Sequence, residues 1–203
     1  MQKLSISILF SALLFMGLSL HAQKLSFPFE PSAENPFGLP NPEANPAIKD
    51  FAPMIGLCNC VSQGRNADQT WAEPEAMTWR FKYVMNGMAV QDETLKTNGV
   101  HSGSIRQFNS DSLKWYVHYY TSNVAVATLP AWEGKSVAEK GKKVFYKEQK
   151  APNGADGFFR LTFYDITDEG YKWIGEWVDK AESIIFPTWK IDCTKIKDLG
   201  LRK

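Results

Sequence analysis

The sequence predicts an all-β protein: an antiparallel meander of roughly ten strands closes into a barrel, and one short N-terminal helix precedes it. Two observations predict this fold. Short segments of alternating apolar and polar residues follow one another from residue 55, and turn-forming pairs such as Asn86-Gly87 and Asn98-Gly99 separate them. No long helical periodicity interrupts the series, which argues against folds with parallel sheets. Closure removes the exposed edges of an open meander, whereas a β-sandwich, the alternative, usually needs longer crossovers.

The first 22 residues have the features of a secretory signal peptide. Lys3 supplies a short positive region, residues 6–18 are apolar but too few to span a bilayer, and Leu20-His21-Ala22 ends at a small residue suited to cleavage. The alternative is an N-terminal membrane anchor. We therefore expect a periplasmic or secreted protein that is not inserted in a membrane after cleavage.

A proline-rich segment over residues 23–45 follows the predicted cleavage site. Six of the chain's 11 prolines lie between residues 24 and 46. Because proline fixes φ and lacks an N–H donor, we expect an extended arm without a core of its own. Interspersed Phe27, Phe29 and Phe37 either hold this arm against the domain or serve as a binding tail, and the cost of exposing phenylalanine favours the first.

Residues 46–203 are predicted to form the barrel domain. Asn45 suits a helix N-cap and Pro46 the first helical position, which predicts a helix over residues 46–54. Ten strands are expected to follow, at residues 55–63, 76–85, 88–96, 102–108, 114–121, 124–130, 142–149, 158–166, 171–178 and 184–193.

The charge balance argues against polyanionic partners. The chain has 23 lysines and arginines against 22 aspartates and glutamates, a formal net charge of +1. Removal of Lys3 with the signal peptide leaves 22 against 22. We therefore expect neither nucleic acid nor an anionic membrane surface as a partner. The expected partner is a small molecule, and we expect the protein to be a monomer or a weak dimer.

The three cysteines predict one disulfide, because an exported chain meets an oxidising compartment. Cys58 and Cys60 alternate on one strand, where their Cβ atoms are about 6.5–7 Å apart, beyond the roughly 3.5–4.5 Å of a disulfide. Barrel closure places the first and last strands side by side, so we predict that Cys193 pairs with Cys58 or Cys60. A three-thiolate metal site is the alternative, but C-x-C spacing without a nearby histidine is not typical of zinc, and no metal is predicted.

Four segments occur in a characteristic order along the chain. They are FAPMIG at residues 51–56, WRF at 79–81 with MNGMAV at 85–90, GSIRQF at 103–108 with KW at 114–115, and RLTFYDI at 160–166 with YKW at 171–173. Together they resemble an uncharacterised bacterial family of lipocalin-like, calycin-type β-barrels. The resemblance implies a calycin-like barrel able to hold a small molecule, and the family has no established activity.

One departure from calycin sequences concerns the first strand. Calycins commonly carry G-x-W there, and a basic residue from the last strand packs over that tryptophan. Here the positions read Gly56-Leu57-Cys58, and the last strand offers Cys193. We therefore expect the usual clasp between the first and last strands to be replaced.

Aromatic side chains that alternate along the predicted strands are candidates for the barrel interior. Trp79 and Tyr83 share one face of a strand, and Trp173 and Trp177 share one face of another. A barrel of this strand number is wide enough for these rings either to fill the interior or to line a cavity.

Two polar residues in the middle of strands are further candidates. Arg106 requires an anion or fixed acceptors if it is buried; it either binds a ligand carboxylate or pairs with Glu93 or Asp165, which we favour. His118 is either a haem ligand or general base, or a hydrogen-bonded sheet histidine, which we favour.

These observations predict an exported barrel that binds a small, mainly apolar or aromatic molecule. The alternatives are an enzyme using His118 and Arg106 in the cavity, a barrel holding non-covalent haem, and an interaction module that docks through its arm or rim. The chain lacks a Ser-His-Asp order, a nucleophile elbow, a phosphate-binding glycine loop and H-E-x-x-H. We therefore predict no catalytic residues and no cofactor.

Overall fold

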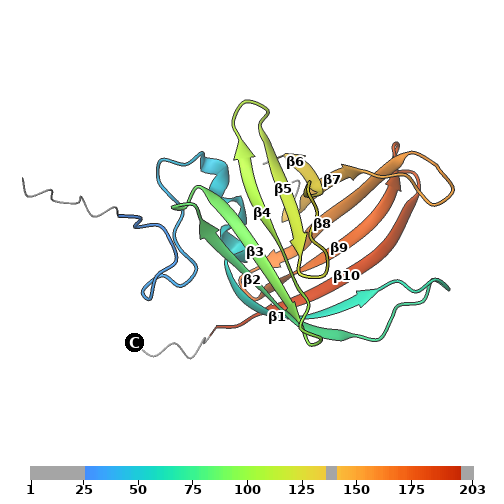
Figure 1. Cartoon of the computed structure of the whole chain (residues 1–203), viewed down its shortest axis with the longest axis horizontal. Helices are drawn as coiled ribbons and strands as arrows, with labels where there is room; N and C mark the ends of the chain where they lie inside the picture. The colour runs from blue at the N-terminus through green and yellow to red at the C-terminus, as the bar shows by residue number, and fades with distance from the viewer. Residues whose placement is uncertain (1–25, 136–140, 198–203) are drawn as a thin grey trace, which may run out of the picture.

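Ten antiparallel strands form one closed barrel, which confirms the predicted fold class. The structure is a computed structural model that describes residues 26–135 and 141–197. The strands pair in the order β1-β10-β9-β8-β7-β6-β5-β4-β3-β2, so every neighbour is a sequence neighbour except where β1 meets β10 (Figure 1). The strands are β1 (Gly56–Gly64), β2 (Glu75–Val84), β3 (Ala89–Lys96), β4 (His101–Asn109), β5 (Lys114–Thr121), β6 (Ala131–Lys135), β7 (Lys143–Glu148), β8 (Gly157–Thr167), β9 (Gly170–Asp179) and β10 (Ile185–Lys195).

The predicted strand over residues 124–130 is wrong. This segment is a loop with exposed Val124 and Val126, and β6 begins at Ala131. The register explains the difference, because His118 of β5 pairs with Ala131, which leaves the intervening residues outside the ladder. The alternation of valine and alanine suits a strand, but β-propensity acts only where a neighbouring strand offers a pairing surface.

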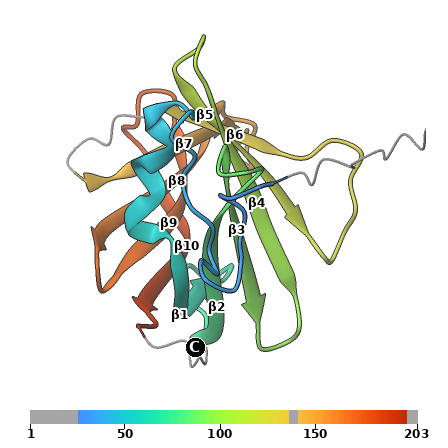
Figure 2. The same cartoon turned by 90° about the vertical axis from the view of Figure 1, so that its left-hand side faces the viewer.

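The short helix η1 (Pro46–Met54) closes one end of the barrel and is of the 3-10 type (Figure 2). It begins as predicted, with the Asn45 Oδ1 accepting a hydrogen bond from the Ala47 N–H at 3.0 Å. Phe51 is fully buried, and its ring centroid lies 4.9 Å from that of Trp115 on β5 and 6.2 Å from that of Phe145 on β7. The helix thus packs against the interior side chains at this end of the barrel.

Residues 26–45 run along the same end and pack against the β2–β3 turn (Figure 2). The Asn86 Oδ1 accepts a hydrogen bond from the Phe29 N–H at 3.2 Å. Gly87 has a φ of 75°, and a Cβ there would lie 2.4 Å from the Leu39 carbonyl oxygen. Only glycine permits both this backbone conformation and this approach of the arm. The predicted signal peptide lies outside the described residues.

A disulfide joins the first and last strands, as predicted. Cys60 and Cys193 lie directly opposite each other between β1 and β10, and the Cys60–Cys193 bond links positions 133 residues apart. Cys58 is the free thiol and is fully buried. Opposite Cys58, β10 carries the basic residue Lys195. Its Nζ donates a hydrogen bond to the Pro53 carbonyl of η1 at 2.9 Å. The disulfide and this lysine contact thus connect the last strand to β1 and to η1.

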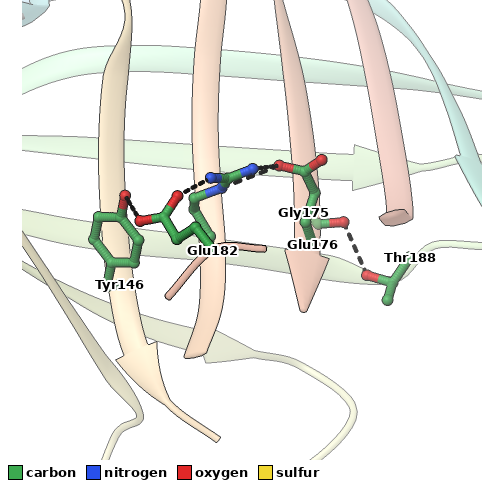
Figure 3. Close-up of polar contacts among 6 residues, drawn as sticks. Tyr146, Gly175, Glu176, Glu182 and Thr188 are labelled. Carbon is green, nitrogen blue, oxygen red and sulfur yellow. Dashed lines mark hydrogen bonds and ion pairs between the residues drawn. The ribbon is translucent and has the colours of Figure 1, made fainter. Parts of the chain in front are cut away.

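A polar cluster centred on Arg160 of β8 joins β7, β9 and the β9–β10 turn, and Figure 3 labels its partners Tyr146, Glu176 and Glu182. Its Nη2 donates to the Glu176 Oε2 at 2.8 Å and its Nη1 to the Glu182 Oε2, while the Tyr146 hydroxyl donates to the Glu182 Oε1 at 2.9 Å. Every guanidinium nitrogen is thus occupied by a partner within the protein. This arrangement attaches the β9–β10 turn to the barrel wall through charge-assisted hydrogen bonds.

Candidate functional site

The barrel interior is only partly filled. A cavity of about 210 Å³ lies within it, lined by side chains from β2 to β6 and from β8 to β10. This volume exceeds the roughly 150 Å³ of an apolar cavity that admits benzene, and is below the roughly 300–1,000 Å³ typical of drug-sized pockets. The cavity therefore suits a molecule of one or two rings.

Aromatic side chains make up most of the apolar lining. They are Trp79, Tyr119, Trp132, Phe159, Trp173 and Trp189. The rings of Trp173 and Trp189 meet edge to face, with centroids 5.2 Å apart. Such rings offer planar apolar surfaces suited to an aromatic guest.

The indole N–H groups of three cavity tryptophans are already bound within the protein. That of Trp189 donates to the Ser62 Oγ at 2.7 Å, and that of Trp132 donates to the Phe159 carbonyl at 3.1 Å. That of Trp79 donates to the Asp92 Oδ2 at 2.6 Å. These bonds hold the ring orientations and leave the ring faces for apolar contact.

A β-bulge directs Trp189 into the cavity. The β9–β10 register shifts between Pro187 and Trp189, so that Thr188 is the extra residue. The Thr188 hydroxyl donates to the Gly175 carbonyl at 3.0 Å, which holds the bulge against β9 (Figure 3). The bulge is consistent with the proline, which has no N–H for the ladder.

A buried ion pair between Arg106 and Asp92 also lines the cavity. Each side chain is only 3% exposed, and the Arg106 Nη1 donates to the Asp92 Oδ1. The Arg106 Cζ lies 4.9 Å from the ring centroid of Phe81 and 5.3 Å from that of Phe51. The guanidinium of Arg106 is thus also stabilised by cation–π interactions with these two phenylalanine rings.

The predicted partners of Arg106, Glu93 and Asp165, are wrong. Glu93 follows Asp92 in β3 and therefore points to the outer face, where it pairs with Arg80. Asp165 pairs with Lys172, and the side chains of both are about half exposed. Asp92 is the partner because it opposes Ser104 across the β3–β4 ladder, which makes Arg106 its diagonal neighbour on the inner face.

Five polar side-chain groups of the lining residues have no hydrogen-bond partner among the described residues. They are the Ser104 hydroxyl, the Tyr119 hydroxyl, the Nε and Nη2 of Arg106, and the Trp173 indole N–H. Ser104 and Tyr119 lie directly opposite each other between β4 and β5, and Arg106 follows two residues along β4. The cavity therefore has hydrogen-bonding capacity on one wall that the described part of the protein does not use.

Two buried titratable groups lie in the core without lining the cavity. Burial raises the pKa of the Cys58 thiol, and burial raises the pKa of the Tyr171 hydroxyl well above its ordinary value. Both groups are therefore neutral at pH 7 and add no charge to the interior.

The predicted site residues separate into two groups. Arg106, Trp79 and Trp173 line the cavity. Tyr83 is buried beneath the arm at the closed end, where a Cβ at Gly38 would lie 3.3 Å from its Cβ.

Trp177 and His118 do not reach the cavity either. The half-buried Trp177 donates to the Gln149 carbonyl at 2.9 Å, near the end of the barrel remote from η1. His118 opposes Ile105 on the outer face of the barrel, whereas Arg106 and Val117 oppose each other on the inner face. The two polar candidates therefore lie on opposite sides of the wall.

Sequence reasoning missed three of the lining aromatics: Tyr119, Trp132 and Phe159. Tyr119 has the same strand parity as the buried Trp115 and Val117, so period-2 alternation was a usable signal for it. Trp132 could not be found in this way, because it follows the segment that was wrongly predicted as a strand.

Comparisons with known proteins identify the fold and nothing more specific. No family model and no curated protein matches the chain. A solved structure, Rv2717c from M. tuberculosis, is similar with a TM-score of 0.52 and 8% sequence identity, over 76% of this chain and 100% of that one. A protein of unknown function from the DUF3598 family of Nostoc punctiforme also matches, with a TM-score of 0.25 and 5% identity, over 75% of this chain and 100% of that one. The first likeness supports a shared barrel fold, and the second carries no argument.

Proposed function

We propose that this protein is an exported barrel that binds a small, mainly aromatic or apolar molecule in its interior. The observation that carries the proposal is the cavity itself. A barrel whose aromatic side chains served only as core would be close-packed, whereas about 210 Å³ is open beside four tryptophans. Unused hydrogen-bonding groups that line the cavity distinguish this space from an accidental packing defect.

The disulfide supports export. The Cys60–Cys193 disulfide is of a kind that persists in oxidising compartments. Among the described residues, no helix is both long enough and apolar enough to cross a membrane. Together with the signal-like first 22 residues, the disulfide favours a periplasmic or secreted location.

The enzyme and haem alternatives receive less support. Both depended on His118, and a catalytic pairing of His118 with Arg106 requires the two side chains to meet in one site. Their positions on opposite faces of β4 and β5 prevent this. Ligand binding without a reaction is therefore the function that the geometry favours.

A cavity-filling variant tests the proposal. Ser104→Phe places a benzyl group in the cavity, and Gln107→Phe places the same group on the outer face of the same strand. We expect toluene and indole to raise the melting temperature of the wild type and of Gln107→Phe, but not of Ser104→Phe. Thermal denaturation and ligand-observed NMR provide the readouts, and equal responses from all three proteins would place binding outside the barrel.

A further inference from the structure

We propose that the cavity selects an uncharged molecule with a hydrogen-bond acceptor, such as an aryl amide or ketone, over the corresponding carboxylate. This inference rests on the proposed function and specifies its ligand. It follows from how the protein distributes charge and hydrogen-bond donors around the cavity.

The charge of Arg106 is neutralised inside the protein. Arg106 and Asp92 are the only charged residues among those that line the cavity, and they pair with each other. Asp92 also accepts the Trp79 indole N–H, so both of its oxygens are occupied. The lining therefore has a net charge of zero, and a carboxylate would enter as an uncompensated buried anion.

All the unused donors except the Trp173 indole N–H lie together on one wall. The hydroxyls of Ser104 and Tyr119 oppose each other between β4 and β5, and the Nη2 of Arg106 is two residues away along β4. The opposite wall, from β9 and β10, presents Trp173 and Trp189. A ring against the indoles would thus direct an attached carbonyl oxygen toward three donors, and a carbonyl oxygen can accept two hydrogen bonds.

Two lysines outside the lining lie beside cavity-lining rings. The Nζ of Lys147 lies 4.9 Å from the Trp132 ring centroid, and that of Lys96 lies 5.5 Å from the Trp189 ring centroid. Lys96 is paired with Glu75 at 2.6 Å, whereas Lys147 has no ion pair among the described residues. The variant Lys147→Gln removes the contribution of Lys147 to anion binding in the experiment.

Matched probes test the charge preference. Titration calorimetry at pH 7.5 compares the affinities of benzamide, benzoate and toluene for the chain without its predicted signal peptide. Benzoate is ionised at this pH. We expect benzamide to bind at least about tenfold more tightly than benzoate, in the wild type and in Lys147→Gln. Benzoate binding as tightly as benzamide would overturn the proposal.

Variants of the donor wall assign the preference to its residues. Ser104→Ala and Tyr119→Phe should each weaken benzamide by about three- to tenfold and leave toluene unchanged, because toluene has no acceptor. Asp92→Asn leaves Arg106 as an unpaired cation and should shift the preference toward benzoate. If Asp92→Asn does not fold, Ser104→Ala and Tyr119→Phe still test the role of the donor wall. An unchanged benzamide affinity in both of these variants would contradict the proposal.

The toluene titration separates the two proposals. Binding of toluene with equal affinities for benzamide and benzoate would leave the proposed function intact and remove the charge selectivity. No binding of any of the three probes would remove both.

Discussion

At the scale of single residues, one position along a strand decides whether a carboxylate serves the cavity or the surface. Asp92 and Glu93 are sequence neighbours of similar chemistry, yet alternation places the first inside the barrel with Arg106 and the second outside with Arg80. Burial makes the inner pair strongly interdependent, whereas water screens the outer pair.

We predict that Asp92→Asn lowers the free energy of unfolding by about 3–5 kcal/mol, because it leaves the Arg106 charge buried without a counterion. The matched change Glu93→Gln should cost less than about 1 kcal/mol, since the Arg80 side chain is 48% exposed. Urea unfolding of both variants measures the difference. Similar losses in the two variants would contradict the role given to Asp92.

A second residue-scale prediction concerns Cys58. Its side chain is fully buried, and burial raises the pKa of its thiol, so little thiolate is present or accessible in the native protein. We expect iodoacetamide at pH 8 to leave the native protein unmodified, and to add one group after unfolding in denaturant without reductant. Intact mass spectrometry counts the added groups. Rapid labelling of the folded protein would show that Cys58 is accessible.

At the scale of elements, the disulfide and η1 stabilise different parts of the barrel. The Cys60–Cys193 bond holds the one seam that joins strands distant in sequence, while η1 covers one end with Phe51. The arm adds to the same end through its contacts with the β2–β3 turn.

We predict that the double variant Cys60→Ser, Cys193→Ser lowers the free energy of unfolding by about 2–5 kcal/mol, because the bond closes a loop of 133 residues in the unfolded chain. Cys58→Ala is the matched control, since it alters the adjacent buried cysteine and keeps the cross-link. Its loss should be smaller. Denaturant unfolding of both proteins is the measurement, and a control that costs as much as the double variant would refute the assignment.

At the scale of the whole molecule, the barrel is closed unevenly. β8 and β9 pair along nearly their whole lengths, whereas β6 and β7 share the single register pair Glu133↔Tyr146. Since β6 also carries Trp132 of the cavity lining, the weakest seam of the wall adjoins the candidate site.

We predict that backbone amides of β6 and β7 exchange with deuterium much faster than those of β8 and β9. Few ladder hydrogen bonds hold the first pair, so local opening costs less than global unfolding there. Hydrogen–deuterium exchange with peptide-level mass spectrometry resolves the two regions. Equal protection of the two pairs would show that the seam is as stable as the rest of the barrel.

Much of the fold could be predicted from the sequence, because its determinants are local. Asn86-Gly87 and Asn98-Gly99 specify tight turns, and period-2 alternation specifies which face of each strand is buried. The segment around Val124 could not be assigned in this way, because strand formation there depends on a partner strand that the register places elsewhere.

The candidate site could be predicted only in part. Trp79 and Trp173 are in the lining, as their alternation indicated, and Arg106 lines it too, while Tyr83 is covered by the arm. The arm's position is a long-range contact with no counterpart in strand periodicity.

The sequence by itself therefore determined the meander, the faces of its strands and the need for a disulfide to Cys193. Only the tertiary structure decided that Cys60 is its partner, that Asp92 neutralises Arg106 and that the interior is open. The physical reason is that local patterns specify the direction of a side chain. Its neighbours across the barrel depend on strand register and closure, which arise from the whole chain.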